Sequence, residues 1–210
     1  MTYRSLFFLL SIALPLTSVA QTSGAGDSSA NPMTVNVSLS AEAAGAIAEL
    51  GLEVPVSGRA FVVVSRTDEE QPRLGTGVTG NPIWSVDVDG LQAGSVTVIG
   101  GSENSVFGYP FDTLDELPPG NYFAQAFLNV YTTFNRADGH VIKAHLNSGA
   151  FQNAFEAPGN AYGDVVPFTV DASGGPDLDL TLSHVIQPPR PLQDGEVLQQ
   201  GNFEDTPWVK

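Results

Sequence analysis

The sequence contains no cysteine, so no disulfide can cross-link the folded chain. Small exported domains often depend on disulfides, and a domain without them must be held together by its hydrophobic core. The chain has 210 residues, of which 42% are hydrophobic, and it includes 12 Phe and 5 Tyr. We therefore expect one domain with a large apolar core.

Basic residues are scarce. The chain has 8 Lys and Arg against 23 Asp and Glu, which gives a formal net charge of −15. Such a surface repels both the phosphates of nucleic acids and anionic membranes. We expect no nucleic-acid partner, and we interpret the acidity as a source of solubility in a salty or periplasmic medium.

Long hydrophobic runs are missing except at the N-terminus. Arg4 precedes an almost unbroken apolar run over residues 6–16. This run is too short for the roughly 20 residues that span a bilayer, and Pro15 interrupts it. The small residues Ser18-Val19-Ala20 then match a signal-peptidase site. The sequence predicts a signal peptide over residues 1–20, cleaved near Ala20, a secreted or periplasmic location, and no membrane span after its removal.

Composition divides the rest of the chain into three parts. Residues 21–32 are rich in Ser, Gly and Ala and predict a flexible tether. Residues 33–186 form the expected domain. Residues 187–210 begin with Gln187-Pro188-Pro189-Arg190-Pro191, which is typical of a stiff polyproline linker. We expect this linker to lead into a further C-terminal domain that is absent from this chain.

The domain has the pattern of an all-β fold. Apolar and polar residues alternate with a period of two, and clusters of Gly and Pro separate the alternating segments. These segments are residues 34–40, 56–65, 84–89, 95–99, 122–130, 165–170 and 177–182. About seven short strands with long loops predict an immunoglobulin-like or fibronectin-like β-sandwich. Pro167 indicates that its strand lies at an edge.

One segment, residues 41–50, is rich in Ala and Glu and is the helical candidate. Gly45 weakens it and Gly51 is expected to end it, so we expect a turn or two at most.

Leu117-Pro118-Pro119-Gly120-Asn121-Tyr122 resembles the tyrosine corner of such sandwiches. In that corner a Tyr near the start of a late strand donates a hydrogen bond back to the preceding loop. The alternative is an ordinary Pro-Gly turn.

Two motifs match cofactor or metal sites only in part. Gly75-Thr76-Gly77-Val78-Thr79-Gly80 has the spacing of a dinucleotide-binding loop, but Asn81-Pro82 and a strand follow it in place of a helix. Asp87-Val88-Asp89-Gly90 begins like a calcium loop, but its twelfth position is Val98, where a Glu is needed. We expect no cofactor and no metal.

Catalytic groups are not arranged for hydrolysis. Ser102, in Gly101-Ser102-Glu103, lacks the second Gly of a nucleophile elbow. His140 and His145 are five residues apart, so they would face opposite sides of a strand and could not share a metal. We therefore expect no catalytic residue in this chain.

A polar segment after a strongly apolar strand is the candidate binding loop. It contains Asn135, Arg136, Asp138 and His140 around Gly139. Loops at the ends of sandwiches often carry binding residues. A purely structural turn is the alternative.

Several segments are similar to the N-terminal β-rich domain of large bacterial secreted proteins whose C-terminal part is an esterase of the α/β-hydrolase fold. They are residues 57–66, 86–90, 117–122, 129–134, 136–140 and 206–210, within a resemblance that covers residues 56–210. The resemblance is most specific over residues 130–140. It implies that the nucleophile elbow lies in a C-terminal domain beginning near Trp208, so no catalytic residue is carried over to this chain.

The leading hypothesis is a non-catalytic accessory domain of an exported esterase-like hydrolase, with the α/β-hydrolase domain as its partner in cis. The alternative is a stand-alone extracellular module that binds a carbohydrate or a protein. Trp84, Tyr109, Phe111 and Tyr162 would form its aromatic platform. The alternation of Trp84 with Ser85 and Asp87 favours a position for Trp84 in the core. A self-contained enzyme is the least favoured hypothesis.

Overall fold

A computed structural model describes residues 32–101, 106–145 and 153–189 of the chain, and these residues form an all-β fold. This confirms the predicted all-β class. The strands are β1 (Thr34–Leu39), β2 (Val56–Ser65), β3 (Ile83–Leu91), β4 (Val96–Gly100), β5 (Phe107–Tyr109), β6 (Gly120–Asn135), β7 (Val141–His145), β8 (Ala161–Gly163), β9 (Val166–Val170) and β10 (Leu178–Val185). The helices are α1 (Ala41–Glu49) and the short 3₁₀ turns η1 (Pro72–Gly75), η2 (Leu114–Glu116) and η3 (Ala154–Glu156).

The predicted signal peptide, nearly all of the tether, Ser102 and most of the C-terminal tail lie outside the described residues. The number of strands was underestimated, because ten are present among the described residues where about seven were predicted. The three without a counterpart in the prediction are β5, β7 and β8. Two of them have only three residues, which is too short to show an alternating pattern.

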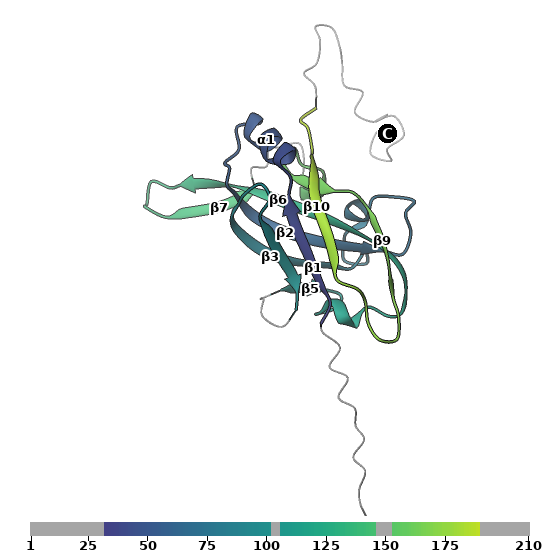
Figure 1. Cartoon of the computed structure of the whole chain (residues 1–210). Coiled ribbons are helices and arrows are strands. Elements are labelled where there is room, and N and C mark those ends of the chain that lie inside the picture. The colour runs from purple at the N-terminus through teal and green to yellow at the C-terminus, as the bar shows by residue number, and fades with distance from the viewer. Residues whose placement is uncertain (1–31, 102–105, 146–152, 190–210) are drawn as a thin grey trace, which may run out of the picture.

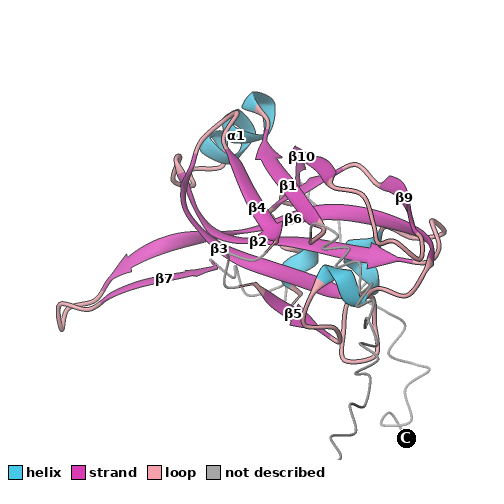
Figure 2. Ribbon diagram, turned by 60° about the horizontal axis from the view of Figure 1, so that its bottom comes forward, coloured by secondary structure: helices cyan, strands magenta, loops and turns pink. Residues whose placement is uncertain are grey.

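All ten strands belong to one hydrogen-bonded sheet, in the order β4-β1-β10-β8-β6-β2-β3-β5, with β7 and β9 also paired to β6. The sheet curls on itself (Figures 1 and 2), so that β4 comes into contact with β3 although the two are not paired. Most pairs are antiparallel, but β1 and β10 are parallel. Curling lets one face of the sheet enclose the core.

The 16-residue strand β6 organises the sheet. It pairs with β2 from Phe123 to Val130, and its other edge pairs first with β9 and then with β8. Its last five residues continue past β2 and pair only with β7. Pro167 lies in β9, which pairs with β6 alone, as predicted for an edge strand.

The core lies on the concave face of the sheet, where alternate residues of β2 and β6 are buried. They include Val62 and Val64 from β2 and Ala126 and Leu128 from β6. Trp84 of β3 joins them with no exposed surface, as its alternation indicated. Burying each large apolar side chain contributes about 2 kcal/mol, so this face is the main source of stability.

The opposite face of the central strands is also covered. The rings of Phe61 and Phe127 lie 5.9 Å apart, and both contact Phe155 of η3. The turn η3 therefore closes a second, aromatic layer over β2 and β6.

Arg73 of η1 is 8% exposed and forms no ion pair with a carboxylate in the described part of the chain. Its guanidinium donates to the carbonyl oxygen of Phe155 and to Gln71 Oε1, and it lies 4.4 Å from the centre of the Tyr162 ring. Burial lowers the pKa of Arg73 from its ordinary value. The guanidinium of Arg73 therefore joins η1, η3 and β8 through its contacts. These oxygen atoms and the ring face replace the water that it loses on burial.

The helix α1 is longer than the sequence predicted. Its nine residues make about two and a half turns. Ser40 caps it by accepting a hydrogen bond from the Ala43 N–H at 3.0 Å, and Ile47 packs into the core. Gly51 adopts φ +77° just after the helix, as expected for a terminating glycine. Capping and burial outweigh the weak propensity of Gly45.

The hydrogen bond of the predicted tyrosine corner is present. The Tyr122 hydroxyl donates to the carbonyl oxygen of Pro118 at 2.6 Å. This bond closes the loop before β6 onto the start of the strand.

β3 extends through Gly90 to Leu91, two residues beyond the predicted segment 84–89. Its register against β2 shifts by one residue between Val88 and Leu91. Gly90 has φ +74°, which fits a bulge with a glycine in the left-handed region. The bulge carries Asp89 to the edge of the sheet near β7.

Candidate binding site

The residues of the predicted binding loop meet at the tip of a hairpin formed by β6 and β7. Asp138 accepts from the Arg136 side chain at 3.0 Å and lies 3.2 Å from His140 Nδ1. The Arg136 N–H donates to the carbonyl oxygen of His140 at 2.9 Å. Asn135 forms the last ladder pair with Val141. The structure brings all four residues together as an exposed turn, and their role in binding stays a prediction.

The two strands behind this tip project from the body of the domain (Figure 2). We call residues 131–145 the arm. Apolar side chains remain exposed along it, by 39% at Phe134, 62% at Val141 and 42% at Ile142. A two-stranded ribbon on its own is only marginally stable in water. The arm is therefore a surface that gains stability when something covers it.

Polar contacts fix the arm where it leaves the body. Lys143 Nζ lies 2.7 Å from Asp89 Oδ1 and 3.3 Å from Ser57 Oγ. The Thr133 hydroxyl donates to Glu53 Oε2 at 3.0 Å. These bonds join the arm to β2, β3 and the segment before β2, so its direction is set even though its tip is exposed.

Asp87 and Asp89, two carboxylates of β3 at the base of the arm, make the stability of the domain depend on pH. A hydrogen bond from Arg59 holds the pKa of Asp87 below its ordinary value of 3.8, and Lys143 and Ser57 do the same for Asp89. A carboxyl whose pKa is lowered by folding stabilises the fold above its unfolded pKa, and the effect is lost as pH falls through the folded pKa. We expect the urea midpoint to fall as the pH is lowered below about 4.

Asp87→Asn should weaken this dependence and lower the midpoint at pH 7 slightly, since the pair with Arg59 is exposed. Asp68→Asn is the control for the loss of one charge, because Asp68 is an exposed carboxylate in the loop that follows β2. An identical pH profile for Asp87→Asn and the wild type would contradict this account.

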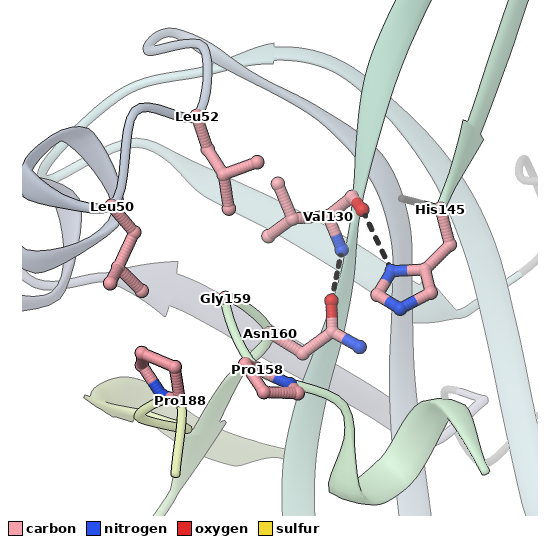
Figure 3. Close-up of a pocket in the computed structure, with 8 residues that line it drawn as sticks. All are labelled: Leu50, Leu52, Val130, His145, Pro158, Gly159, Asn160 and Pro188. Atoms are coloured by element: carbon pink, nitrogen blue, oxygen red, sulfur yellow. Dashed lines mark hydrogen bonds between the residues drawn. The ribbon is translucent and has the colours of Figure 1, made fainter. Parts of the chain in front are cut away.

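A pocket of about 160 Å³ lies at the base of the arm (Figure 3). Its wall comes from five segments that are separated in the sequence. The lining residues are Leu50, Leu52, Val130, His145, Pro158, Gly159, Asn160 and Pro188. Cavities of this size in other proteins hold one benzene-sized group. The pocket is therefore large enough for a single ring or a branched side chain.

Two polar side chains hold the strand beside the pocket. Asn160 Oδ1 accepts from the Val130 N–H at 2.8 Å, and Asn160 Nδ2 donates to the carbonyl oxygen of Ala154 at 2.7 Å. His145 Nδ1 lies 3.3 Å from the Val130 carbonyl oxygen (Figure 3). A carbonyl can only accept, so Nδ1 carries the proton in this contact. His145 Nε2 is buried and has no partner among the described atoms.

The sequence did not predict this pocket. Leu52, Pro158 and Pro188 show no local signal, because only the curl of the sheet brings their segments together. Of the two histidines judged unsuitable for metal, His140 is at the tip of the arm and His145 is at its base. In the described ranges, no group of three potential ligands is close enough to hold a metal ion.

The predicted aromatic platform does not form. Trp84 is buried in the core, and Tyr162 lies between Arg73 and the ring of His184. Phe111 packs against the core. Tyr109 is 43% exposed, but its hydroxyl donates to the carbonyl oxygen of Val78. Tyr109 is paired with Ile83, the residue before Trp84, so its ring and the indole face opposite sides of the sheet. Tyr162 lies on β8, away from both.

Within the part of the chain that the structure covers, no helix is long and apolar enough to cross a membrane. A comparison of the chain with known protein families, curated proteins and solved structures found no match.

Proposed function

We propose that this chain is a non-catalytic accessory domain that binds a protein partner through the arm and the pocket at its base. The observation that carries the proposal is the projecting arm, where residues 131–135 of β6 pair only with β7. Phe134 and Ile142 are exposed there as a cross-strand pair, and Val141 is exposed on the opposite face. Exposed apolar side chains that lie side by side, as Phe134 and Ile142 do, are typical of interaction sites. The pocket beside the arm could accept an anchoring side chain.

The partner we propose is an esterase-like α/β-hydrolase domain in cis. Support comes from the resemblance of residues 56–210 to the N-terminal domain of secreted esterases. An exported location, reached through the signal peptide of residues 1–20, belongs to the same proposal. The domain would then position or shelter the hydrolase, and the hydrolase would supply the chemistry.

The immunoglobulin-like or fibronectin-like classification is also part of this proposal. It is supported by the hydrogen bond from Tyr122 to Pro118 and by the contact of β4 with β3, which places two parts of the sheet across one core. One feature differs from a sandwich of two separate sheets: here the strands form a single continuous hydrogen-bonded sheet.

Reading the gene beyond codon 210 tests the partner, and hydrogen exchange tests the arm. If an in-frame hydrolase domain follows, amides of residues 131–145 should exchange at least about 10-fold more slowly in the longer protein than in this chain. The reason is that a docked partner covers a ribbon that otherwise opens easily.

Ile142→Ser should abolish this difference, because it removes one apolar contact from the arm. Val78→Ser is the matched control, since Val78 is 83% exposed in a loop away from the arm. Equal exchange in both proteins would rule out docking through the arm. A stop codon with no hydrolase gene nearby would rule out the hydrolase partner but not the arm. Turnover of a generic ester by the purified chain would rule out a non-catalytic role.

A second candidate is a stand-alone extracellular module that binds a carbohydrate or a protein. The pocket favours it, because it combines apolar walls with the buried, unpartnered Nε2 of His145. Saturable binding by this chain alone, lost in a variant that fills the pocket such as Leu50→Trp, would support this candidate over the first.

A further inference from the structure

A second pocket lies at the end of β2 opposite the arm, and an arginine lines it. It has a volume of about 480 Å³. Its walls are mainly apolar and include Val64, Pro82, Phe111 and Leu117. The charged group in this wall is the guanidinium of Arg66, the residue directly after β2.

The guanidinium is held in one place by the tyrosine corner. Arg66 Nη2 donates to the Tyr122 hydroxyl at 2.8 Å, and the guanidinium carbon lies 4.6 Å from the centre of the Tyr122 ring. Gly120 leaves room for it, since a Cβ there would lie 2.8 Å from Arg66 Nη1. A cation fixed in this way loses little freedom when it binds an anion.

This arginine has no carboxylate partner in the described part of the chain. Arg59, Arg136 and Lys143 each pair with an aspartate. Arg66 forms no such pair, although three exposed acidic residues follow within four positions and the chain has 23 in all. Among the described residues it forms one hydrogen bond, which leaves most of its five N–H donors without a partner there.

A further donor is available beside Arg66. The Ser65 hydroxyl accepts from the Thr67 N–H at 3.2 Å, and its own hydrogen has no acceptor among the described residues. Ser65 and Arg66 both line the pocket. Together they offer a planar, charged fork and a hydroxyl at the edge of an apolar cavity, which is the arrangement that recognises a carboxylate.

We propose that this pocket binds a small organic carboxylate that has an apolar body. The carboxylate pairs with the Arg66 guanidinium, and the body lies against Pro82, Phe111 and Leu117. The site is separate from the arm and does not depend on the proposed accessory role. Binding involves no covalent step.

Benzoate and its neutral counterpart benzamide test this proposal. In a titration of the ¹⁵N-labelled chain, benzoate should shift the amides of residues 64–67, of Leu117 and of residues 120–122 in a saturable way, with a dissociation constant of about 1–10 mM. Benzamide should bind at least about 10-fold more weakly, because it cannot pair with the guanidinium. Salt should weaken the binding of benzoate more than that of benzamide.

Arg66→Gln should reduce benzoate binding to the level of benzamide. Arg59→Gln removes an equal charge from a partly exposed position in β2 that does not line this pocket, and it should leave binding unchanged. Tyr122→Phe keeps the ring and loses the hydroxyl that positions the guanidinium. It should therefore weaken the binding of benzoate while the far-UV circular dichroism spectrum stays native. Equal affinity for benzoate and benzamide, unaltered binding in a folded Arg66→Gln variant, or no saturable shift up to about 50 mM would overturn the proposal.

Discussion

Gly58→Ala should destabilise the domain by about 3 kcal/mol, which corresponds to a fall in Tm of roughly 10 °C. Gly58 lies in β2 opposite Val130 of β6. A Cβ at this position would overlap the carbonyl oxygen of Asn129 and would lie 3.3 Å from Val130 Cα. These are backbone atoms of the central strand pair, so they cannot move aside without breaking the ladder.

The same substitution at Gly45 should stabilise the domain instead of destabilising it. Gly45 lies within α1, and a Cβ there would meet nothing within 4 Å. Alanine favours the helix over glycine by up to about 1 kcal/mol, so Gly45→Ala should raise the Tm. Urea unfolding followed by far-UV circular dichroism measures both variants. A neutral Gly58→Ala would contradict the close contact between β2 and β6.

Trp84→Ala should cost about 4 kcal/mol, the largest loss expected from a single side chain. The indole has no exposed surface and is in the main core cluster. Its removal leaves a cavity between strands that are paired on both sides and cannot close around it.

Trp84→Phe is the informative comparison. The indole Nε1 is buried with no partner among the described atoms, so the native side chain already carries an unsatisfied donor. Phenylalanine loses some packing but removes this donor, and the net cost should be only about 1 kcal/mol. Far-UV circular dichroism in urea is the suitable probe because it does not depend on tryptophan. Equal losses in the two variants would mean that packing by the ring contributes little.

Alternation in the sequence predicted much of the fold. The segment 56–65 coincides with β2, and its β-branched run lies in the middle of the sheet. The tyrosine corner was predicted because its donor and acceptor are only four residues apart. Strands of three residues were missed, since the neighbours they pair with, and not their own sequence, determine their conformation.

The candidate site was predicted only in part. The turn at Asn135, Arg136, Asp138 and His140 was found because a polar cluster directly follows a long apolar strand. The projection of the arm was not predicted from the sequence, because it depends on β6 continuing past the end of β2. The pocket at the base and the Arg66 pocket each combine segments that are far apart in the chain.

The all-β class, the face of each long strand that enters the core and the position of the polar turn could all be predicted from the order of the residues. These features depend on local spacing and on the chemistry of neighbouring residues. Three further features became clear from the folded chain alone: ten strands form one curled sheet, the arm leaves this sheet, and Arg66 has no carboxylate partner among the described residues. These depend on contacts between residues distant in the sequence, which become defined only when the strands pair and the core closes.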